Sequence, residues 1–268
     1  MLTLKEQVEV LRATGYNTLL AQAKVAHDAV LLAIKRSGFK ANGTIKGGVV
    51  MSALTNDIRR ATMDMDIDFI HHPISETGVR RFVLRLAKSV PEFEMTIRGK
   101  IVDLKHEDYR GKRIFLMVKD ASIPHGIRTK MDIGVHTHDD IKQVDIDFEM
   151  ASGESAATLQ ANSIEQNFTE KMLSLLRHGV VSNRPKDIYD LFYLSGQVSV
   201  RKLKAYVKEL IYESRRCRAN SKQDILDSLE IIFSAKAFRR RLNNAKANWL
   251  QVDPQSAIEE ILDIIHKL

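Results

Sequence analysis

The chain has 268 residues, of which 44% are hydrophobic and 28% charged, the balance of a folded globular protein with room for two domains or one elaborated one. No segment approaches the roughly 18 uninterrupted apolar residues of a membrane span, and the N-terminus lacks a signal-peptide profile. A single cysteine, Cys217, excludes an internal disulfide framework, so we expect a cytoplasmic protein without a membrane partner.

The net charge of +7 suggests a polyanionic partner such as nucleic acid, although many basic proteins bind none. Clusters of basic residues could bind such a partner. They lie on a predicted helix over residues 75–89 and in the C-terminal half, as Arg80, Arg81, Arg85, Lys88, Arg215, Arg216, Arg218, Arg239, Arg240 and Arg241.

The N-terminal half alternates helices and strands. Residues 3–14 predict a short helix, and apolar residues at helical spacing predict a second, which begins near Leu19 and ends at Gly38, a residue suited to a C-terminal cap. A short element at Ile45 enters a Gly-Gly turn, followed by a predicted helix over residues 49–54. Strands are predicted over residues 65–70, 94–101, 114–118, 130–135 and 144–148.

The C-terminal half has only helical periodicity. Helices are predicted over residues 163–178, 184–196, 200–213, 221–233, 235–249 and 254–268, the last with Asp253 as N-cap and Pro254 at its first position. The small and polar residues 151–155 suit a connection. We therefore expect an α/β domain over residues 1–152 and a helical domain over residues 153–268.

An acidic strand is the most informative feature of the sequence. Asp64, Asp66 and Asp68 alternate with apolar residues, so on a strand they share one face. Like charges in a row repel one another, and hard oxygen ligands at this spacing suit Mg²⁺, which binds one or two carboxylates together with substrate phosphates. Which two of the three carboxylates bind metal stays open.

A glycine pair precedes this strand by about one helix length. Gly47 and Gly48 follow Lys46 and have no Cβ atoms, so their backbone can approach a phosphate closely. A glycine pair, a helix and an Asp-x-Asp strand resemble the signature of a nucleotidyltransferase, in which two metal ions bridge a triphosphate and an attacking hydroxyl. Arg60 and Thr62 lie just before the strand, as further candidates for nucleotide binding.

A third carboxylate is usually needed to hold two metals. Asp132 is the best candidate, because it lies within a predicted strand among apolar neighbours, where an isolated carboxylate is costly. Asp145 and Asp147 repeat the alternation but lack a preceding glycine turn, so we do not favour them.

The helical half carries a second polar cluster. Lys171 lies among apolar residues at helical spacing, which suggests that its ammonium group meets an anion such as a triphosphate. Lys186 is a further candidate for nucleotide binding. It lies four residues before Asp190, so the two could pair on one helix face. An ion pair at the start of the helix would explain the spacing of Lys186 and Asp190 as well as a functional role does.

Four runs of residues together resemble the AbiEii/AbiGii toxin family of nucleotidyltransferases, the toxins of bacterial abortive-infection and type IV toxin–antitoxin pairs. They follow the family's order over about residues 45–195, as Lys46-Gly47-Gly48, Arg60-Ala61-Thr62-x-Asp64-x-Asp66, Glu170-Lys171-Met172-Leu173 and Arg184-Pro185-Lys186-Asp187-Ile188-Tyr189-Asp190-Leu191.

The resemblance implies a polymerase-beta-like nucleotidyltransferase domain, a mixed sheet with flanking helices, followed by an all-helical domain that contributes Lys171 and the Lys186-to-Asp190 motif to the cleft. The glycine pair would face the triphosphate. Asp64 and Asp66 would hold two Mg²⁺ ions, Lys171 would contact phosphate, and Asp190 would help to activate the acceptor or would orient Lys171.

The implied activity is transfer of a nucleotide from an NTP to RNA, notably the 3′ end of tRNA, which blocks translation and serves phage defence. A cognate antitoxin is implied as a partner, with direct binding left open. The alternatives are transfer to a protein or a small hydroxylated molecule, and a nucleotide-binding regulatory module without turnover.

Overall fold

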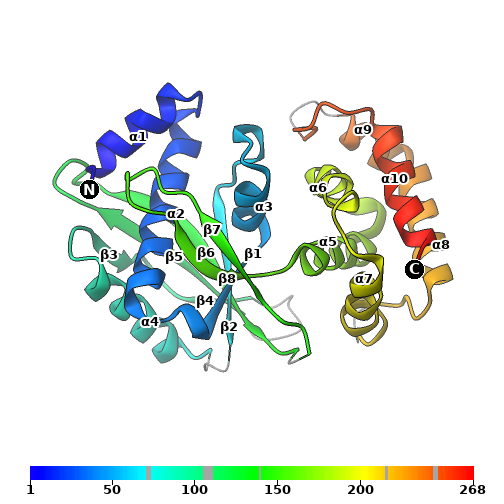
Figure 1. The fold of residues 1–268 in the computed structure, drawn as a ribbon, viewed down its shortest axis with the longest axis horizontal. Coiled ribbons are helices and arrows are strands. Elements are labelled where there is room, and N and C mark those ends of the chain that lie inside the picture. The colour runs from blue at the N-terminus through cyan, green and yellow to red at the C-terminus, as the bar shows by residue number, and fades with distance from the viewer. Residues whose placement is uncertain (71–73, 105–110, 139, 215–216, 244–246) are drawn as a thin grey trace. The chain divides into compact units, whose positions relative to one another are not determined.

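The computed structural model describes residues 1–70, 74–104, 111–138, 140–214, 217–243 and 247–268. The chain forms two compact units, Met1–Asn162 and Ser163–Leu268. Figure 1 shows strands and helices in the first unit and helices in the second. Within the described residues, no helix is long and apolar enough to cross a bilayer.

The N-terminal unit contains four α-helices among its described residues, with two short 3₁₀ helices at Lys40–Asn42 and Ile58–Arg60. The helices are α1 (Leu4–Ala13), α2 (Thr18–Ser37), α3 (Gly47–Thr55) and α4 (Glu76–Ser89). The strands are β1 (Gly43–Lys46), β2 (Asp64–Ile70), β3 (Glu94–Ile97), β4 (Val102–Leu104), β5 (Gly111–Lys119), β6 (Ile127–His136), β7 (Val144–Phe148) and β8 (Ala157–Ala161).

Local capping fixes the two N-terminal helices where the sequence predicted them. Thr3 and Glu6 form a reciprocal capping box at the start of α1. Asn17 caps α2 by accepting from the Leu20 N–H at 3.0 Å. Gly38 ends α2 with φ of 69°, which confirms the predicted C-terminal cap.

The strands of the described residues form one mixed eight-stranded sheet in the order β3-β5-β6-β2-β1-β8-β7, with β4 on β5. β2 is central, antiparallel to β1 and parallel to β6. Because β1 and β6 flank it, the side chains of three strands can meet on each face of the sheet around β2.

The core lies on one face of this sheet. Met65, Ile67 and Phe69 of β2 are fully buried, as their period of two predicts. The Phe69 ring meets the rings of Phe39 and of Phe82 from α4 at centroid distances of 5.3 and 5.0 Å. Burial of this face leaves the aspartates of β2 on the opposite face.

The C-terminal unit is helical throughout its described residues. Its fully buried side chains include Tyr189, whose hydroxyl donates to the Leu242 carbonyl at 2.9 Å. The elements are α5 (Ile164–His178), a 3₁₀ turn (Gly179–Val181), α6 (Lys186–Ser195), α7 (Val200–Val207) continued by a π-helical turn (Lys208–Tyr212), α8 (Lys222–Ser234), α9 (Lys236–Leu242) and α10 (Pro254–His266).

The structure differs from the sequence expectation at four places, of which one is β8, a strand that the sequence did not predict. The units divide after residue 162 rather than after residue 152, because β8 pairs with both β7 and β1. The helix expected over residues 235–249 ends at Leu242. The strand expected over residues 94–101 ends at Ile97, and β4 begins at Val102.

Candidate active site

The three aspartates of β2 form the centre of the candidate site. They lie on the face opposite the buried apolar residues, as the alternation predicted. Asp64 and Asp66 are half-buried, whereas only 4% of Asp68 is exposed. A carboxylate that is so deeply buried needs a positive partner or hydrogen bonds.

The sheet register brings residues that are distant in sequence next to Asp66. Lys46 of β1 stands opposite Asp66 on the antiparallel side. Asp132 of β6 stands beside Asp66 on the parallel side. The pairing therefore supports the expectation that Asp66 and Asp132 lie together, since both are cross-strand partners at the same level of the sheet.

Basic side chains pair with carboxylates on this face. Lys46 Nζ lies 2.9 Å from Asp68 Oδ1, and Lys130 Nζ lies 2.5 Å from Asp64 Oδ2. Lys130 was not among the predicted site residues, because only the β2–β6 register places it beside Asp64. The ion pairs balance the charge of a carboxylate row that would otherwise repel itself.

Arg113 binds Asp132 through both ends of its guanidinium. Arg113 lies on β5, directly across from Asp132 on β6. Its Nε and Nη2 atoms donate to the two Asp132 carboxylate oxygens at 2.7 and 2.8 Å. Hydrogen bonding to Asp132 is the main reason that the pKa of Arg113 is raised. The negative charges of Asp64 and Asp66 raise this pKa further. Sequence reasoning missed Arg113, whose role depends on strand pairing.

The donor set of this face fits a divalent cation. Asp66 and Asp132 supply hard oxygen ligands on neighbouring strands at one register level, with Asp64 next along β2. The geometric fit is incomplete, since the described residues contain no group of three or more His, Cys, Asp or Glu positioned to hold an ion. Asp132 would have to leave Arg113, at least in part, to become a ligand.

The Gly-Gly turn packs directly on the acidic strand. Gly47 has φ of +65°, and a Cβ there would lie 2.4 Å from Asp66 Oδ2. A Cβ at Gly48 would lie 2.6 Å from Thr62 Oγ1. Both positions therefore require glycine for a close approach, and α3 begins at this turn with the positive end of its dipole.

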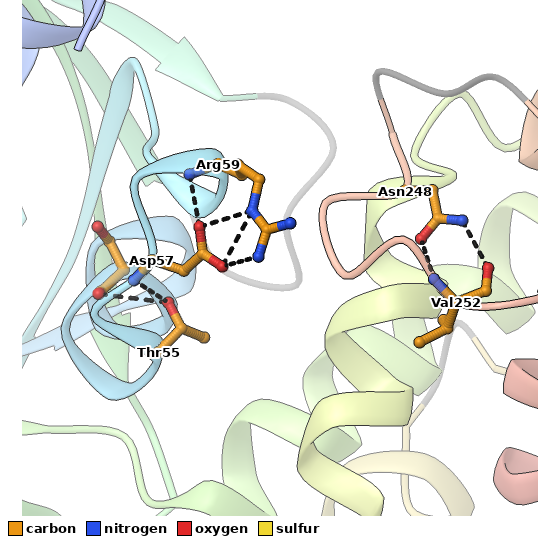
Figure 2. Close-up of polar contacts among 6 residues, drawn as sticks. Thr55, Asp57, Arg59, Asn248 and Val252 are labelled. Carbon is orange, nitrogen blue, oxygen red and sulfur yellow. Dashed lines mark hydrogen bonds and ion pairs between the residues drawn. The ribbon is translucent and has the colours of Figure 1, made fainter. Parts of the chain in front are cut away.

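The link from α3 to β2 is held by its own polar contacts. Asp57 accepts from the Arg59 N–H at 2.8 Å and from the Arg59 guanidinium, as Figure 2 shows. Arg60, the last residue of the 3₁₀ turn, is buried, and Thr62 Oγ1 donates to the Asp64 carbonyl at 3.3 Å. These contacts fix where the acidic strand begins.

The helical unit contains a buried ion-pair cluster. Lys171 Nζ of α5 lies 2.6 Å from Asp190 Oδ2 and 3.0 Å from Asp187 Oδ1, both on α6. Asp190 is fully buried, and its other oxygen accepts from Trp249 Nε1 at 3.0 Å. The structure thus brings together the predicted residues Lys171 and Asp190 and adds Asp187, which the sequence showed only as a neighbour of Lys186.

Trp249 sits in a loop with its own hydrogen bonds. Asn248 Nδ2 donates to the Val252 carbonyl at 2.6 Å and its Oδ1 accepts from the Val252 N–H at 3.2 Å (Figure 2). The Tyr193 ring packs on Trp249 at a centroid distance of 5.6 Å. Lys186, predicted to bind nucleotide, is the half-buried first residue of α6.

The other acidic pair lies away from this face. Asp145 and Asp147 are exposed on β7, the last strand of the sheet order in the described residues. Asp145 pairs with Lys40 at 3.1 Å, and Asp147 accepts from Thr158 Oγ1 at 2.5 Å. Both aspartates therefore make the polar contacts that are usual for surface residues.

A mixed sheet with flanking helices, followed by helices, is the fold of a nucleotidyltransferase, and solved structures share it. A candidate nucleotidyltransferase from H. pylori is 14% identical with a TM-score of 0.53 over 93% of this chain and 94% of that one. MenT4, a nucleotidyltransferase toxin from Mycobacterium tuberculosis H37Rv, is 15% identical with a TM-score of 0.50 over 99% of both chains. No curated protein matches the chain.

Residues 29–264 match the family model described as nucleotidyl transferase AbiEii toxin of type IV toxin–antitoxin systems. The chain belongs to this family and is a nucleotidyltransferase. The match extends over both units and confirms the resemblance inferred from the motifs. Membership implies an NTP substrate and an antitoxin partner.

Proposed function

We propose that this toxin transfers a nucleotide from an NTP to the 3′ end of an RNA, with tRNA as the main acceptor, and thereby blocks translation. The observation that carries the proposal is the Gly47 turn packed on Asp66, with Asp64 and Asp132 beside it. This arrangement joins a backbone able to approach phosphate to hard oxygen ligands.

In the reaction, an oxygen of the acceptor hydroxyl attacks the α-phosphorus of the NTP. A new phosphorus–oxygen bond forms, the bond to the β-phosphate oxygen breaks, pyrophosphate leaves and the hydroxyl proton is lost. The first turn of α3, entered through Gly47 and Gly48, orients the triphosphate, because the N-terminus of a helix favours negative charge.

Mg²⁺ is the proposed metal, held by Asp64 and Asp66 with Asp132 as a third ligand. When bound, it supplies charge neutralisation at the triphosphate and at the attacking oxygen. Lys46 lies on the neighbouring strand, opposite Asp66, and its ammonium group can hold either Asp68 or a phosphate oxygen. Arg60 and Thr62 position the start of the acidic strand.

Lys171 is proposed to bind a phosphate group of the NTP, with Asp190 and Asp187 orienting its ammonium group. Two carboxylates at 2.6 and 3.0 Å hold Lys171 in one position, which reduces the entropy lost when it binds an anion. Lys186 at the start of α6 is a second candidate for phosphate contact.

RNA is the favoured acceptor because the chain carries a net charge of +7. Arg80, Arg81, Arg85 and Lys88 are exposed on α4, where they could contact a phosphate backbone. Arg218 and Arg239–Arg241 are further candidates, while Arg215 and Arg216 lie outside the described residues.

The test is incubation of the purified protein with each labelled NTP and total RNA in Mg²⁺, followed by gel separation. We expect label in the tRNA band, removed by EDTA and restored by excess Mg²⁺. Label that appears in protein, or in a small hydroxylated molecule, would replace RNA as the acceptor. Nucleotide binding without any labelled product would identify a regulatory module.

A further inference from the structure

A cavity of about 270 Å³ lies within the N-terminal unit, lined by α2, α3 and the end of β7. One water occupies about 30 Å³ in the liquid, and pockets for drug-sized ligands begin at about 300 Å³. The cavity is thus suited to an organic molecule about the size of a nucleobase. Of its lining residues, Thr62 alone has a part in the proposed transfer reaction.

His27 of α2 presents an unsatisfied ring nitrogen in this cavity. Its side chain is 2% exposed, and Nε2 has no hydrogen-bond partner within the part of the chain that the structure describes. Burial, with the nearby charge of Lys24, lowers the pKa of His27 to about 4, so the ring is neutral at pH 7.

The neutral His27 ring carries a single proton, which either ring nitrogen can hold. With the proton on Nδ1, Nε2 is an acceptor. A buried acceptor without a donor is unfavourable, so a ligand that donates an N–H to Nε2 would gain the missing hydrogen bond.

The polar lining of the cavity is acidic overall. Asp28, Asp147 and Glu149 line it, against a single basic side chain, Lys24. Asp28 is satisfied by Lys24 Nζ at 2.5 Å and by the Ala151 N–H at 2.9 Å. The excess of carboxylates favours a positively charged ligand and opposes an anionic one.

Apolar side chains form another part of the wall, which suits a flat ring. Leu31, Val49, Ala53, Ala61 and Phe148 line the cavity. Burial of a ring against them removes apolar surface from water and so stabilises binding.

We propose that this cavity binds a small aromatic amine or amidine, whose ring packs on the apolar wall and whose N–H groups bind His27 Nε2 and the acidic lining. The ligand would touch α3 through Val49, Ser52 and Ala53, and it would touch Thr62, which packs against Gly48. It would therefore contact the same helix that carries the glycine turn.

Benzamidine and benzoate test the proposal, because they share size and shape but differ in charge and in N–H donors. We expect benzamidine to bind the wild-type protein in calorimetry and benzoate to bind at least about tenfold more weakly. In ¹H–¹⁵N spectra of the wild type, benzamidine should shift the His27 Nε2 resonance, assigned with His27→Phe, and benzoate should not.

Ala53→Leu fills the cavity from α3, leaves the His27 side chain in place and should abolish benzamidine binding, with Ser52→Leu as the second filling variant if the first does not fold. The ¹⁵N measurement needs no filling variant. Absence of saturable benzamidine binding, equal affinity for both probes, an unmoved Nε2 resonance or unchanged affinity in a folded filling variant would each overturn the proposal.

Discussion

Asp66 holds the central position among the residues of the candidate site. Register places it opposite Lys46 and beside Asp132, and Gly47 leaves no space for a Cβ next to its carboxylate. Lys46 and Asp132, its neighbours on the two flanking strands, are both charged. The surroundings of the Asp66 carboxylate therefore suit the binding of an ion rather than apolar packing. Removal of its charge should therefore affect chemistry more than stability.

Asp66→Asn should lower nucleotide transfer by about 100-fold or more, since a bound metal contributes several kcal/mol and each 1.36 kcal/mol is tenfold in rate. The change keeps the size of the side chain and leaves the ion pairs of Asp64 and Asp68 in place, so the thermal midpoint should change little. Labelling of RNA and differential scanning calorimetry measure the two quantities.

Asp145→Asn is the matched control, because Asp145 belongs to the same Asp-x-Asp pattern but is exposed on β7. It should keep wild-type transfer. Equal activity of the Asp66 variant and the control would remove Asp66 from the mechanism.

Lys171 has a structural role that its place in the sequence does not reveal. Removing one partner of a buried ion pair costs about 3–5 kcal/mol, because the remaining charge has lost its counterion. Asp190 is fully buried and pairs with Lys171. Lys171→Met should therefore lower the free energy of unfolding as well as transfer activity.

Lys171→Met/Asp190→Asn separates the two roles. The neutral amide that replaces the Asp190 carboxylate can still accept from Trp249, so most of the lost stability should return in urea denaturation, without recovery of transfer. If the double variant regains both stability and activity, Lys171 contributes to folding alone.

Among the elements, the β1–α3 turn links the fold to the chemistry. Gly47 has a left-handed backbone conformation and lies in close contact with Asp66. A side chain at this position would therefore strain the backbone and also displace the Asp66 carboxylate. The turn is short because β1 ends at Lys46 and α3 begins at the next residue. Its geometry decides how near the first turn of α3 lies to the carboxylate.

Gly47→Ala should destabilise the protein by about 1–2 kcal/mol, the cost of a left-handed conformation for an L-residue. It should also displace the Asp66 carboxylate and reduce transfer nearly as much as Asp66→Asn. Gly153→Ala is the matched control, with φ of +77° and no atom within 4 Å of an added Cβ.

The control should show the loss of stability without the loss of transfer. Urea denaturation and RNA labelling of both variants give the comparison. Full activity in the Gly47 variant would show that the turn can accept a Cβ near Asp66.

The sequence predicted elements well where local signals are strong. The alternation of β2 and the glycine after α2 lie in local sequence, and both are confirmed. The segment of β8, residues 157–161, carries two alanines and a glutamine, which have little strand preference, so pairing with β1 and β7 decides its conformation. Arg113 and Lys130 were missed for the same reason, since strand pairing alone brings them to the carboxylates.

At the scale of the whole molecule, charge is the property that bears on the acceptor. The net charge of +7 attracts any polyanion, whereas the positions of individual arginines decide where on the surface the polyanion binds. Arg81 and Lys88 are exposed on α4, while Arg85 also donates to the Ser37 carbonyl at 2.9 Å and ties α4 to α2. Arg81 and Lys88 are thus the better pair for a charge reversal.

Arg81→Glu/Lys88→Glu should weaken RNA labelling, leave the NTP KM unchanged and lower the slope of log affinity against log salt by about 1 for each lost phosphate contact. Lys5→Glu/Arg12→Glu on the exposed side of α1 lowers net charge equally and is the control. Equal effects of the two pairs would indicate a general field rather than a binding surface on α4.

The position of β8 has a consequence for synthesis on the ribosome. β1 ends at Lys46, whereas β8, one of its two neighbours in the sheet, ends more than a hundred residues later, at Ala161. A nascent chain that has emerged only to residue 152 still exposes the edge of β1, and such unpaired edges favour association between chains. The sheet that carries the aspartates is therefore completed only when nearly all of the first unit has emerged.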